Sequence, residues 1–434
     1  MKFFRTILVG VVLVTCSAIT SYAQVEETSI NNSGSFYSLF GIGFPTDHNT
    51  SRELGMGIVG VSLGGIQSNS LQNPALWGSN AFTTISTGFN LSQFQTSNGT
   101  SENVNSLLEP GYFQATVPLL KEKLAFSASM YSVTRSNYRF VTFDSSATTQ
   151  NNTVEFGTDI RGTGGINKLE LGLGWKISKN LSIGYAPSLA FISQSSSKDV
   201  FFSEAGFGNN SINSKITGTA FGHRLGALFT MRKVLSSKDR ISIGATANLP
   251  INIDANKETT ATKFVDGRDQ EIQLNDGESG EIRLPMEAKA GFTYYPSNFV
   301  NFSVEGLYEQ WSDYNSDFTL TGNNADMQDR LKVGFGGEYH PYRTNSGAFL
   351  SNFRYSGGVS YDSGHLEIEG EKINTLWFSA GLGIISPRSS STVDFGIRYG
   401  LRGTTNQDLI REKIWTFNIS VNLSELMFIR RRFQ

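Results

Sequence analysis

The chain has 434 residues and a formal net charge of −2 at pH 7, with 45 glycines, 10 prolines and one cysteine. This near-neutral net charge gives no indication of a nucleic-acid partner. The one cysteine, Cys16, lies in the leader described next. The rest of the chain therefore has no disulfide, no thiolate nucleophile and no cysteine-ligated metal.

The first 23 residues have the pattern of a secretory signal peptide. Lys2 and Arg5 precede an apolar run, Thr6–Ile19, and the cleavage-site pattern Ser21-Tyr22-Ala23 follows it. The run is shorter than the ~20 residues of a membrane-spanning helix, which disfavours an uncut anchor. A lipoprotein cut at the cysteine is a second alternative. We expect residues 1–23 to be removed and the remainder to leave the cytoplasm.

Residues from 81 onward alternate persistently between apolar and polar side chains, as in a β-strand between two environments. In Lys168–Ser178, Leu169, Leu171 and Trp175 share one face, while Glu170 shares the other face with glycines. The tally is about fourteen strands, many near the ~9–11 residues that a tilted strand needs to cross the hydrocarbon layer. The other segments are Leu181–Phe191, Ile241–Ile253, Ile282–Tyr294, Phe302–Tyr308, Leu331–Tyr339, Phe353–Tyr361, Leu376–Ile384, Val393–Leu401 and Trp415–Leu423, with weaker versions at Ile85–Leu91, Phe113–Leu119, Leu124–Met130 and Thr219–Met231.

The connections alternate between short and long, which distinguishes a membrane barrel from a soluble sandwich. Short turns fall at Lys179-Asn180, Pro296-Ser297-Asn298 and Pro387–Ser391. The long connections are Thr96–Pro110, Asp144–Asn167, Gln194–Ile216, Asp254–Gly280, Ser312–Arg330, Asp362–Asn374 and Gly403–Lys413. Outer-membrane barrels have tight periplasmic turns and long external loops, and lipid leaves no strand edge unpaired. We therefore predict an all-β, fourteen-stranded antiparallel transmembrane barrel, multi-pass in the outer membrane, with both termini periplasmic.

Charges at mid-strand positions indicate a lumen. On a lipid-facing position each would cost a few kcal/mol, so these side chains must face inward. They are Glu287, Lys289, Glu305, Lys332, Glu338, Arg354, Asp394 and Arg398. Their mixed signs favour structural ion pairs, with one another or with a plug. The cations among them, Lys289, Lys332, Arg354 and Arg398, are also candidates to bind the head group of a ligand.

A barrel of fourteen strands is too wide for its own side chains to fill, so it must be an open pore or hold a plug. Residues 24–80 precede the first strand and are long enough to form a hatch inside a barrel of residues 81–434. Asn73, Pro74 and Ala75 lie at the junction between the two. Pro74 fixes its own φ and restricts the residue before it, so we expect this tripeptide to shape the hatch.

The run Gly55–Gly65 and the tripeptide Asn73-Pro74-Ala75 together resemble the N-terminal hatch of the FadL/TodX family of outer-membrane transporters. That family carries long-chain fatty acids and aromatic hydrocarbons. Further similarity lies downstream, where one strand ends in Tyr294-Tyr295-Pro296, the next ends in Trp311-Ser312-Asp313-Tyr314, and Val333–Tyr339 is rich in glycine. The resemblance covers nearly the whole mature chain. It implies fourteen strands, an N-terminal hatch and passive uptake of a hydrophobic small molecule.

The resemblance also implies a capture site among the external loops Gln194–Ile216 and Asp254–Gly280. The first of these loops contains the apolar residues Val200, Phe201, Phe202 and Phe207. Exposed apolar groups can mark an interaction surface, although packing within the loop would need the same residues. The family's sideways exit depends on a kink in the third strand, and Leu124–Phe140 contains neither glycine nor proline to mark one. Lateral exit and periplasmic exit of the ligand are therefore both kept as alternatives.

Catalysis is not expected, because no histidine lies beside a Gly-x-Ser-x-Gly or a comparable nucleophile motif. The four histidines are His48, His223, His340 and His365. No cofactor and no metal site are predicted. The expected partners are a hydrophobic small molecule and the lipid and lipopolysaccharide of the outer membrane. The alternative function is a non-transporting barrel subunit of an outer-membrane secretion or assembly complex, which would add a protein partner.

Overall fold

The structure is a computed structural model that describes most of the chain from Ser33 onward. The predicted signal peptide, residues 1–23, lies outside the described residues. The described ranges are residues 33–64, 70–149, 152–202, 210–265, 268–318, 325–341, 349–386 and 391–425. Within these ranges, no helix has the length and apolar character needed to cross a membrane.

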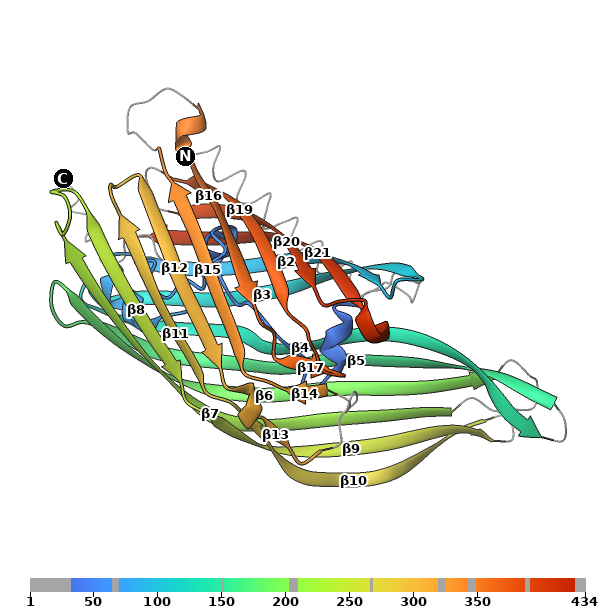
Figure 1. The fold of residues 1–434 in the computed structure, drawn as a ribbon. Coiled ribbons are helices and arrows are strands. Elements are labelled where there is room, and N and C mark those ends of the chain that lie inside the picture. Colours follow the sequence, from blue (N-terminus) through green and yellow to red (C-terminus); the bar gives the residue numbers. More distant parts are fainter. Residues whose placement is uncertain are drawn as a thin grey trace, which may run out of the picture. The chain divides into compact units, whose positions relative to one another are not determined.

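Successive strands pair in antiparallel order around a closed wall with fourteen positions. Two positions hold two strands each, because β8 continues into β9 and β10 continues into β11, and the wall closes where β2 pairs with β21. The wall strands are β2 (Thr83–Ser97), β3 (Glu102–Leu120), β4 (Leu124–Thr149), β5 (Asn152–Lys176), β6 (Leu181–Phe202), β7 (Asn210–Arg232), β8 (Arg240–Asn248), β9 (Ile251–Val265), β10 (Arg268–Leu284), β11 (Glu287–Tyr295), β12 (Val300–Glu309), β15 (Arg330–Tyr339), β16 (Phe353–Asp362), β19 (Thr375–Ile385), β20 (Thr392–Arg402) and β21 (Arg411–Glu425). The predicted all-β, fourteen-stranded barrel is confirmed (Figure 1).

Side chains alternate between the outer and the inner side of this wall. On β5, Leu169, Leu171 and Trp175 are exposed on the outside, whereas Glu170 on the inside is 1% exposed. Of the mid-strand charges predicted to face inward, Glu287 is half-buried and the other seven are buried. The apolar outer face suits lipid, and the charged inner face needs partners inside the barrel.

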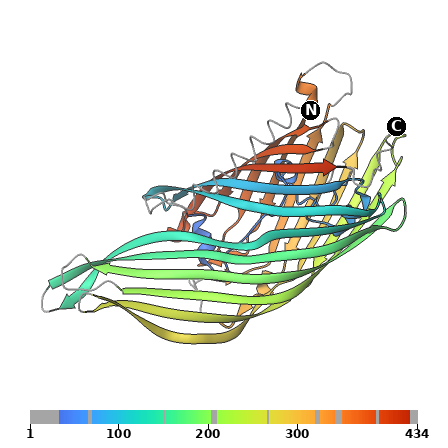
Figure 2. The ribbon, with the colours of Figure 1, turned by 180° about the vertical axis from the view of Figure 1, so that it is seen from behind.

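The wall has a tall side and a low side. On the tall side, β4, β5, β6 and β7 have 26, 25, 22 and 23 residues. On the low side, β12, β15, β16, β19 and β20 have 10 or 11 residues each, which is enough to cross a membrane once. The excess of about a dozen residues adds roughly 40 Å at about 3.3 Å per residue. Figures 1 and 2 show β4 to β7, β9 and β10 extending past one end of the low strands.

Four of the predicted long loops are wrong. Most of Thr96–Pro110, Asp144–Asn167, Gln194–Ile216 and Asp254–Gly280 lies in strands β2 to β7, β9 and β10 rather than in irregular loops. Beyond the membrane both faces of a sheet meet water, so its side chains need not alternate between apolar and polar. Apolar periodicity therefore marks only the part of each strand that faces lipid.

Two predicted strands are each interrupted at a proline. Ile241–Ile253 is divided into β8 and β9 at Leu249-Pro250, and Ile282–Tyr294 is divided into β10 and β11 at Pro285-Met286. Proline has no backbone N–H for the ladder, so it is found at such irregular points. The irregularity exchanges the two faces: Ile243 is 43% exposed on the outside, whereas Ile251 is buried inside.

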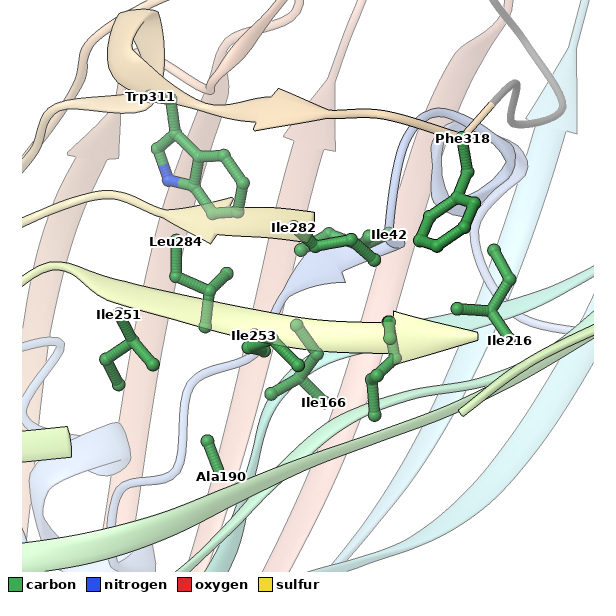
Figure 3. Packing of buried hydrophobic residues seen from close by; sticks show 12 residues of the cluster. Ile42, Ile166, Ala190, Ile216, Ile251, Ile253, Ile282, Leu284, Trp311 and Phe318 are labelled. Atoms are coloured by element: carbon green, nitrogen blue, oxygen red, sulfur yellow. The ribbon is translucent and has the colours of Figure 1, made fainter. Parts of the chain in front are cut away.

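The inner side of the tall wall carries the largest apolar cluster among the described residues, near the level where the low wall ends (Figure 3). Isoleucines from five wall strands meet Ile42 from the N-terminal part and Trp311 and Phe318 from the chain after β12. Trp311 is 2% exposed, and its indole N–H donates to Glu309 Oε2 at 2.9 Å. The cluster consists of Ile42, Ile166, Ala190, Ile192, Ile216, Ile251, Ile253, Ala255, Ile282, Leu284, Trp311 and Phe318.

Short elements fill the ends and the interior. Tight turns such as Lys121–Lys123 and Lys179-Asn180 mark one end of the barrel, which we call the short-turn end. At the other end β14, β17 and β18 form a three-stranded sheet. The short elements are η1 (Phe36–Leu39), β1 (Phe44–Pro45), α2 (Ser51–Gly55), η2 (Pro74–Ser79), η3 (Trp311–Asp313), β13 (Asn315–Ser316), β14 (Ala325–Met327), η4 (Phe349–Asn352), β17 (Leu366–Ile368), β18 (Glu371–Lys372) and η5 (Asn406–Asp408).

Candidate functional site in the barrel lumen

The described part of residues 33–82, called the lumen segment below, lies against the inner side of the wall. Inward glycines let its backbone approach closely. A Cβ on Gly226 of β7 would lie 2.4 Å from Asn73 Oδ1, and a Cβ on Gly336 of β15 would lie 1.9 Å from the Met56 carbonyl oxygen. Both distances are far too short for a side chain, so strands of the tall side and of the low side each contact this segment through bare backbone.

The tripeptide Asn73-Pro74-Ala75 begins helix η2 in this segment. Asn73 is its N-cap: Oδ1 accepts a hydrogen bond from the Ala75 N–H at 2.9 Å, and Pro74 takes the first helical position. The Asn73 amide also donates to the carbonyls of Val61 at 2.9 Å and Ala227 at 3.0 Å. Asn73 therefore ties together η2, an earlier turn of the lumen segment and strand β7.

Asp47 of the lumen segment is the centre of a cationic group on the low wall. Its carboxylate lies 2.6 Å from Lys332 Nζ on β15 and 2.9 Å from Arg398 Nη1 on β20, with Arg330 Nη2 at 4.0 Å. Arg398 also lies over the ring of Trp377 at 4.1 Å. Lys332 and Arg398 are both buried, so each needs the Asp47 carboxylate to compensate its charge.

A second ion-pair group lies nearer the short-turn end. Arg52 of α2 makes two hydrogen bonds to Glu338, at 2.7 and 2.8 Å. Glu338 also contacts Arg354 at 3.2 Å, and Arg354 reaches Asp394 at 2.5 Å. This chain of charges joins α2 to strands β15, β16 and β20.

Glu305 and Lys289 bind the lumen segment in a different way. The Glu305 carboxylate accepts from the backbone N–H groups of Gly60, Val61 and Ser62, the last two at 3.0 and 2.8 Å. Lys289 Nζ donates to Gln72 Oε1 at 2.8 Å and pairs with Glu287 at 2.8 Å on its own strand. All four predicted head-group cations thus contact acidic side chains, and Lys289, Lys332 and Arg398 also contact the lumen segment directly.

Strands β3 and β4 part from each other above Tyr112 and Tyr131. Their pairing runs from Leu120↔Leu124 to Tyr112↔Tyr131, whereas β3 continues along β2 and β4 continues along β5. The pairing of β4 with β5 shifts register between Ser132 and Thr134. The third strand therefore has an irregularity at Val133, although no glycine or proline marks it.

The lumen segment occupies the freed edge of β4 in place of β3. Phe44 and Pro45 pair with Arg135 and Thr134, and Thr46 N–H donates to the Val133 carbonyl at 2.9 Å. One ion pair bridges this side opening: Arg135 Nη1 of β4 lies 2.7 Å from Glu109 Oε1 of β3.

A cavity of about 140 Å³ lies between the lumen segment and this side opening. Its lining includes Leu107 and Glu109 from one edge of the opening, Arg135 from the other edge, and Asp47 and Arg398 from the lumen. The Nε of Arg398, the Oδ1 of Asn418 and both ring nitrogens of His48 have no hydrogen-bond partner within the described structure. The cavity is therefore polar on its lumen side.

The predicted capture residues lie at the end of the tall wall that is farthest from the short-turn end. Val200, Phe201 and Phe202 end strand β6, and Phe201 is 36% exposed with its ring 6.1 Å from that of Phe143 on β4. Phe207, the fourth predicted capture residue, lies outside the described residues. These side chains are distant in the fold from the four lumen cations, because β6 continues far beyond the low wall.

The described residues contain no cluster of three metal-ligating side chains. His48 stacks on Tyr131 at 4.3 Å, and His365 packs between Phe44 and Trp311. Sequence reasoning missed Asp47, Arg52, Glu109 and Arg135 as site residues. For Asp47 and Arg52 a signal was present, since they are charges within a segment predicted to be enclosed by the barrel.

Comparison with known proteins places the chain in two contexts. The model of a family described as BamG matches residues 4–434. The structure is similar to a Pseudomonas aeruginosa FadL homologue, with a TM-score of 0.60 and 14% identity over 88% of this chain and 99% of that one. It is also similar to the Ralstonia pickettii toluene transporter TbuX, with a TM-score of 0.57 and 14% identity over 86% and 98% of the chains.

A third similar structure is the CymD monoaromatic hydrocarbon channel, with a TM-score of 0.56 and 16% identity over 87% of this chain and 97% of that one. At such identities the likeness establishes the fold, and it supports the predicted resemblance to FadL/TodX proteins. No curated protein matches the sequence.

Proposed function

The chain belongs to the BamG family, and from that premise we propose that it is an outer-membrane channel through which hydrophobic small molecules, such as long-chain fatty acids, diffuse. The observation that carries this proposal is the side opening between β3 and β4, whose edges line the lumen cavity. We place the short-turn end and both termini in the periplasm and the tall wall outside the cell, because tight turns are periplasmic in such barrels.

In this proposal the ligand leaves the lumen sideways through the opening at Val133. The cavity of about 140 Å³ is smaller than the ~300 Å³ that ligand pockets usually need, so passage requires the lumen segment to shift. The segment acts as a hatch: it covers the freed edge of β4 with Phe44 and Pro45, and the Arg135–Glu109 pair closes the remaining span.

Four arginines line this cavity, Arg135, Arg330, Arg398 and Arg402, and one of them is a predicted head-group candidate. Of the four predicted candidates, Arg398 lines the cavity, while Lys289, Lys332 and Arg354 do not. Each buried CH₂ of an acyl chain contributes about 0.8 kcal/mol, so a long chain needs few polar contacts. We assign Arg398, which also pairs with Asp47 of the hatch, to the head group. The other three cations hold the hatch in place, Lys289 and Lys332 directly and Arg354 through Glu338.

For capture outside the cell we propose the aromatic group at the end of the tall wall. Phe143 is 77% exposed and packs edge-on against Phe201, with Val200 and Phe202 beside it on β6. Exposed apolar groups at this height would give a hydrophobic ligand its first contact above the lipopolysaccharide.

The channel is tested by closing the side opening. The mature chain has no cysteine, so Glu109→Cys/Arg135→Cys gives one reactive pair across the gap. Cells lacking the gene would be complemented with this variant and treated with a bis-methanethiosulfonate crosslinker. We expect uptake of a labelled long-chain fatty acid to fall at least tenfold and to recover after reduction.

The matched control is Thr96→Cys/Asn103→Cys, which places cysteines on β2 and β3 where the two strands already pair. Crosslinking there leaves the opening unchanged, so uptake should change less than twofold. If the Glu109/Arg135 crosslink leaves uptake unchanged at equal surface abundance, sideways passage is wrong.

A second candidate function is a non-transporting barrel subunit of an outer-membrane secretion or assembly complex. The observation that favours it is the number of contacts that fix the lumen segment: the Asp47 group, the Arg52–Glu338 pair and the three N–H donors to Glu305. A plug held this firmly suits a barrel that serves as a scaffold.

The two functions differ in what a deletion changes. If the chain is a scaffold, it should co-purify with another outer-membrane protein in fixed stoichiometry. Cells lacking the gene should then take up fatty acid normally but have less of that partner protein at the surface. A channel predicts reduced uptake with other outer-membrane proteins unchanged.

A further inference from the structure

A cavity of about 660 Å³ lies at the short-turn end. It is bordered by the β7–β8 turn, the β11–β12 turn, the ends of β15 and β16, and the lumen segment at Arg52 and Gly64. Several lining side chains, among them Glu338, Asn301 and Arg354, project from the inner side of the wall. The cavity is therefore the mouth of the barrel and lies on the lumen side rather than the lipid side.

The lining of this mouth is strongly cationic. It contains six lysine or arginine side chains and two acidic ones, Asp239 and Glu338. Glu338 is already bound to Arg52 and Arg354. The six cations are Arg52, Arg232, Lys233, Lys238, Arg240 and Arg354.

The other acid of the mouth, Asp239, is engaged by backbone rather than by cations. Its carboxylate accepts from the N–H groups of Val234 at 2.8 Å, Leu235 at 2.7 Å and Ser236 at 3.1 Å. Burial acts to raise the pKa of this carboxyl, but the backbone donors outweigh it and lower the pKa. Asp239 thus stays charged while it shapes the turn that carries Arg232, Lys233 and Lys238.

These three turn cations are exposed and form no ion pair within the described structure. Arg240 lies beneath them, with its guanidinium 3.8 Å from the Tyr295 ring centre and donating to the Gly64 carbonyl at 3.0 Å. Phe82 and Phe299 add apolar surface to the same lining. The mouth therefore combines unpaired positive charge with aromatic walls.

We propose that this basic mouth binds an acidic peptide segment of a partner protein at the periplasmic end of the barrel. A single phosphate or carboxylate would occupy a small part of about 660 Å³, and the unpaired cations are spread along a turn, so several acidic side chains are needed to match them. A membrane lipid does not fit, because the cavity opens inside the wall, where acyl chains have no lipid to enter.

The proposal is tested by fluorescence anisotropy with the purified full-length mature chain in detergent. The probe is a fluorescein-labelled peptide of alternating glycine and glutamate, compared with a glycine–glutamine peptide of equal length. We expect the acidic peptide to bind and the glycine–glutamine peptide not to bind. The affinity should fall as the salt concentration increases, because salt screens exposed charges. Arg232→Glu/Lys238→Glu should weaken binding at least tenfold.

The matched control is Lys121→Glu/Lys179→Glu, which reverses two exposed lysines in other turns at the same end, outside the cavity lining. It changes net charge equally and should alter affinity less than twofold. Equal weakening by both variants would show attraction to net charge only and overturn the proposal.

Two further outcomes also contradict it. Inorganic phosphate that displaces the peptide at equal charge concentration would mean a small-anion site. Nanodiscs containing phosphatidylglycerol that bind the chain through Arg232 and Lys238, with no peptide binding, would mean a lipid surface. Absence of peptide binding to the wild-type chain would overturn the proposal directly.

Discussion

The tall and low sides of this barrel wall are built from the same kind of strand but differ in strand length and in the contacts that their inner faces make. Low strands such as β15, with 10 residues, only cross the membrane, and their buried charges Lys332 and Glu338 bind the lumen segment. Tall strands such as β4, with 26 residues, continue into water, and the inner side carries an apolar cluster. The low wall thus binds the lumen segment by ion pairs, whereas the tall wall needs packed side chains to support its extension.

Trp311→Ala is expected to give the largest effect, because it opens the cluster at the base of the tall wall. Trp311 is 2% exposed, and truncating a buried tryptophan costs roughly 3–5 kcal/mol. The free energy of unfolding in urea, followed by the heat-modifiable gel mobility of the folded barrel, should fall by that amount. Trp175→Ala, at a site 46% exposed on the outer side, is the control and should cost far less. Equal losses would mean that the tall wall does not depend on this cluster.

The contrast between the walls also explains what the sequence could predict. The low strands were located to within two residues, for example Leu331–Tyr339 against the observed Arg330–Tyr339, because lipid on one side and charge on the other enforce strict alternation. Beyond the membrane this requirement ends, so the parts of β2 to β7, β9 and β10 farthest from the short-turn end were predicted as loops. The face exchange at Pro250 and Pro285 also leaves no trace in apolar periodicity.

Little of the site could be predicted from single residues. Asn73 and Pro74 were expected to shape the hatch, whereas their roles as the N-cap and first residue of η2 were not predicted and appear only in the structure. The partners of the lumen charges could not be predicted, since alternation gives the face of Lys332 but not the residue that meets it across the lumen. The irregularity at Val133 likewise arises from backbone pairing, without glycine or proline.

Asp47→Leu should act on the low wall alone. It leaves Lys332 and Arg398 buried without their carboxylate, and breaking a buried pair costs roughly 3–5 kcal/mol. Asp47 itself is 25% exposed toward the cavity, where water can reach it. We therefore expect a loss of stability at the lower end of this range, about 3 kcal/mol. Protease digestion should show the lumen segment cut faster while the barrel stays folded. Asp326→Leu, at an exposed position on β14, is the control. If the barrel itself unfolds as readily as the lumen segment is cut, the low wall and this segment unfold as one cooperative unit. That result would contradict the proposed difference between the two walls.

Glu109→Gln tests the boundary of the tall wall at β4 and should have the smallest effect on stability. The Glu109–Arg135 pair is partly exposed, with side chains 18% and 20% accessible, and such pairs contribute below about 1 kcal/mol. Its expected consequence is local: the two edges of the side opening separate more often, because β3 and β4 have no backbone pairing there. A cysteine at Leu107, which lines the cavity, reports this opening. Leu107→Cys should react with a maleimide several times faster in the Glu109→Gln background than in the otherwise wild-type chain, and Glu102→Gln, on the same strand but away from the gap, should leave the rate unchanged. An unchanged rate with Glu109→Gln would mean that the lumen segment on β4, rather than the ion pair, closes the opening.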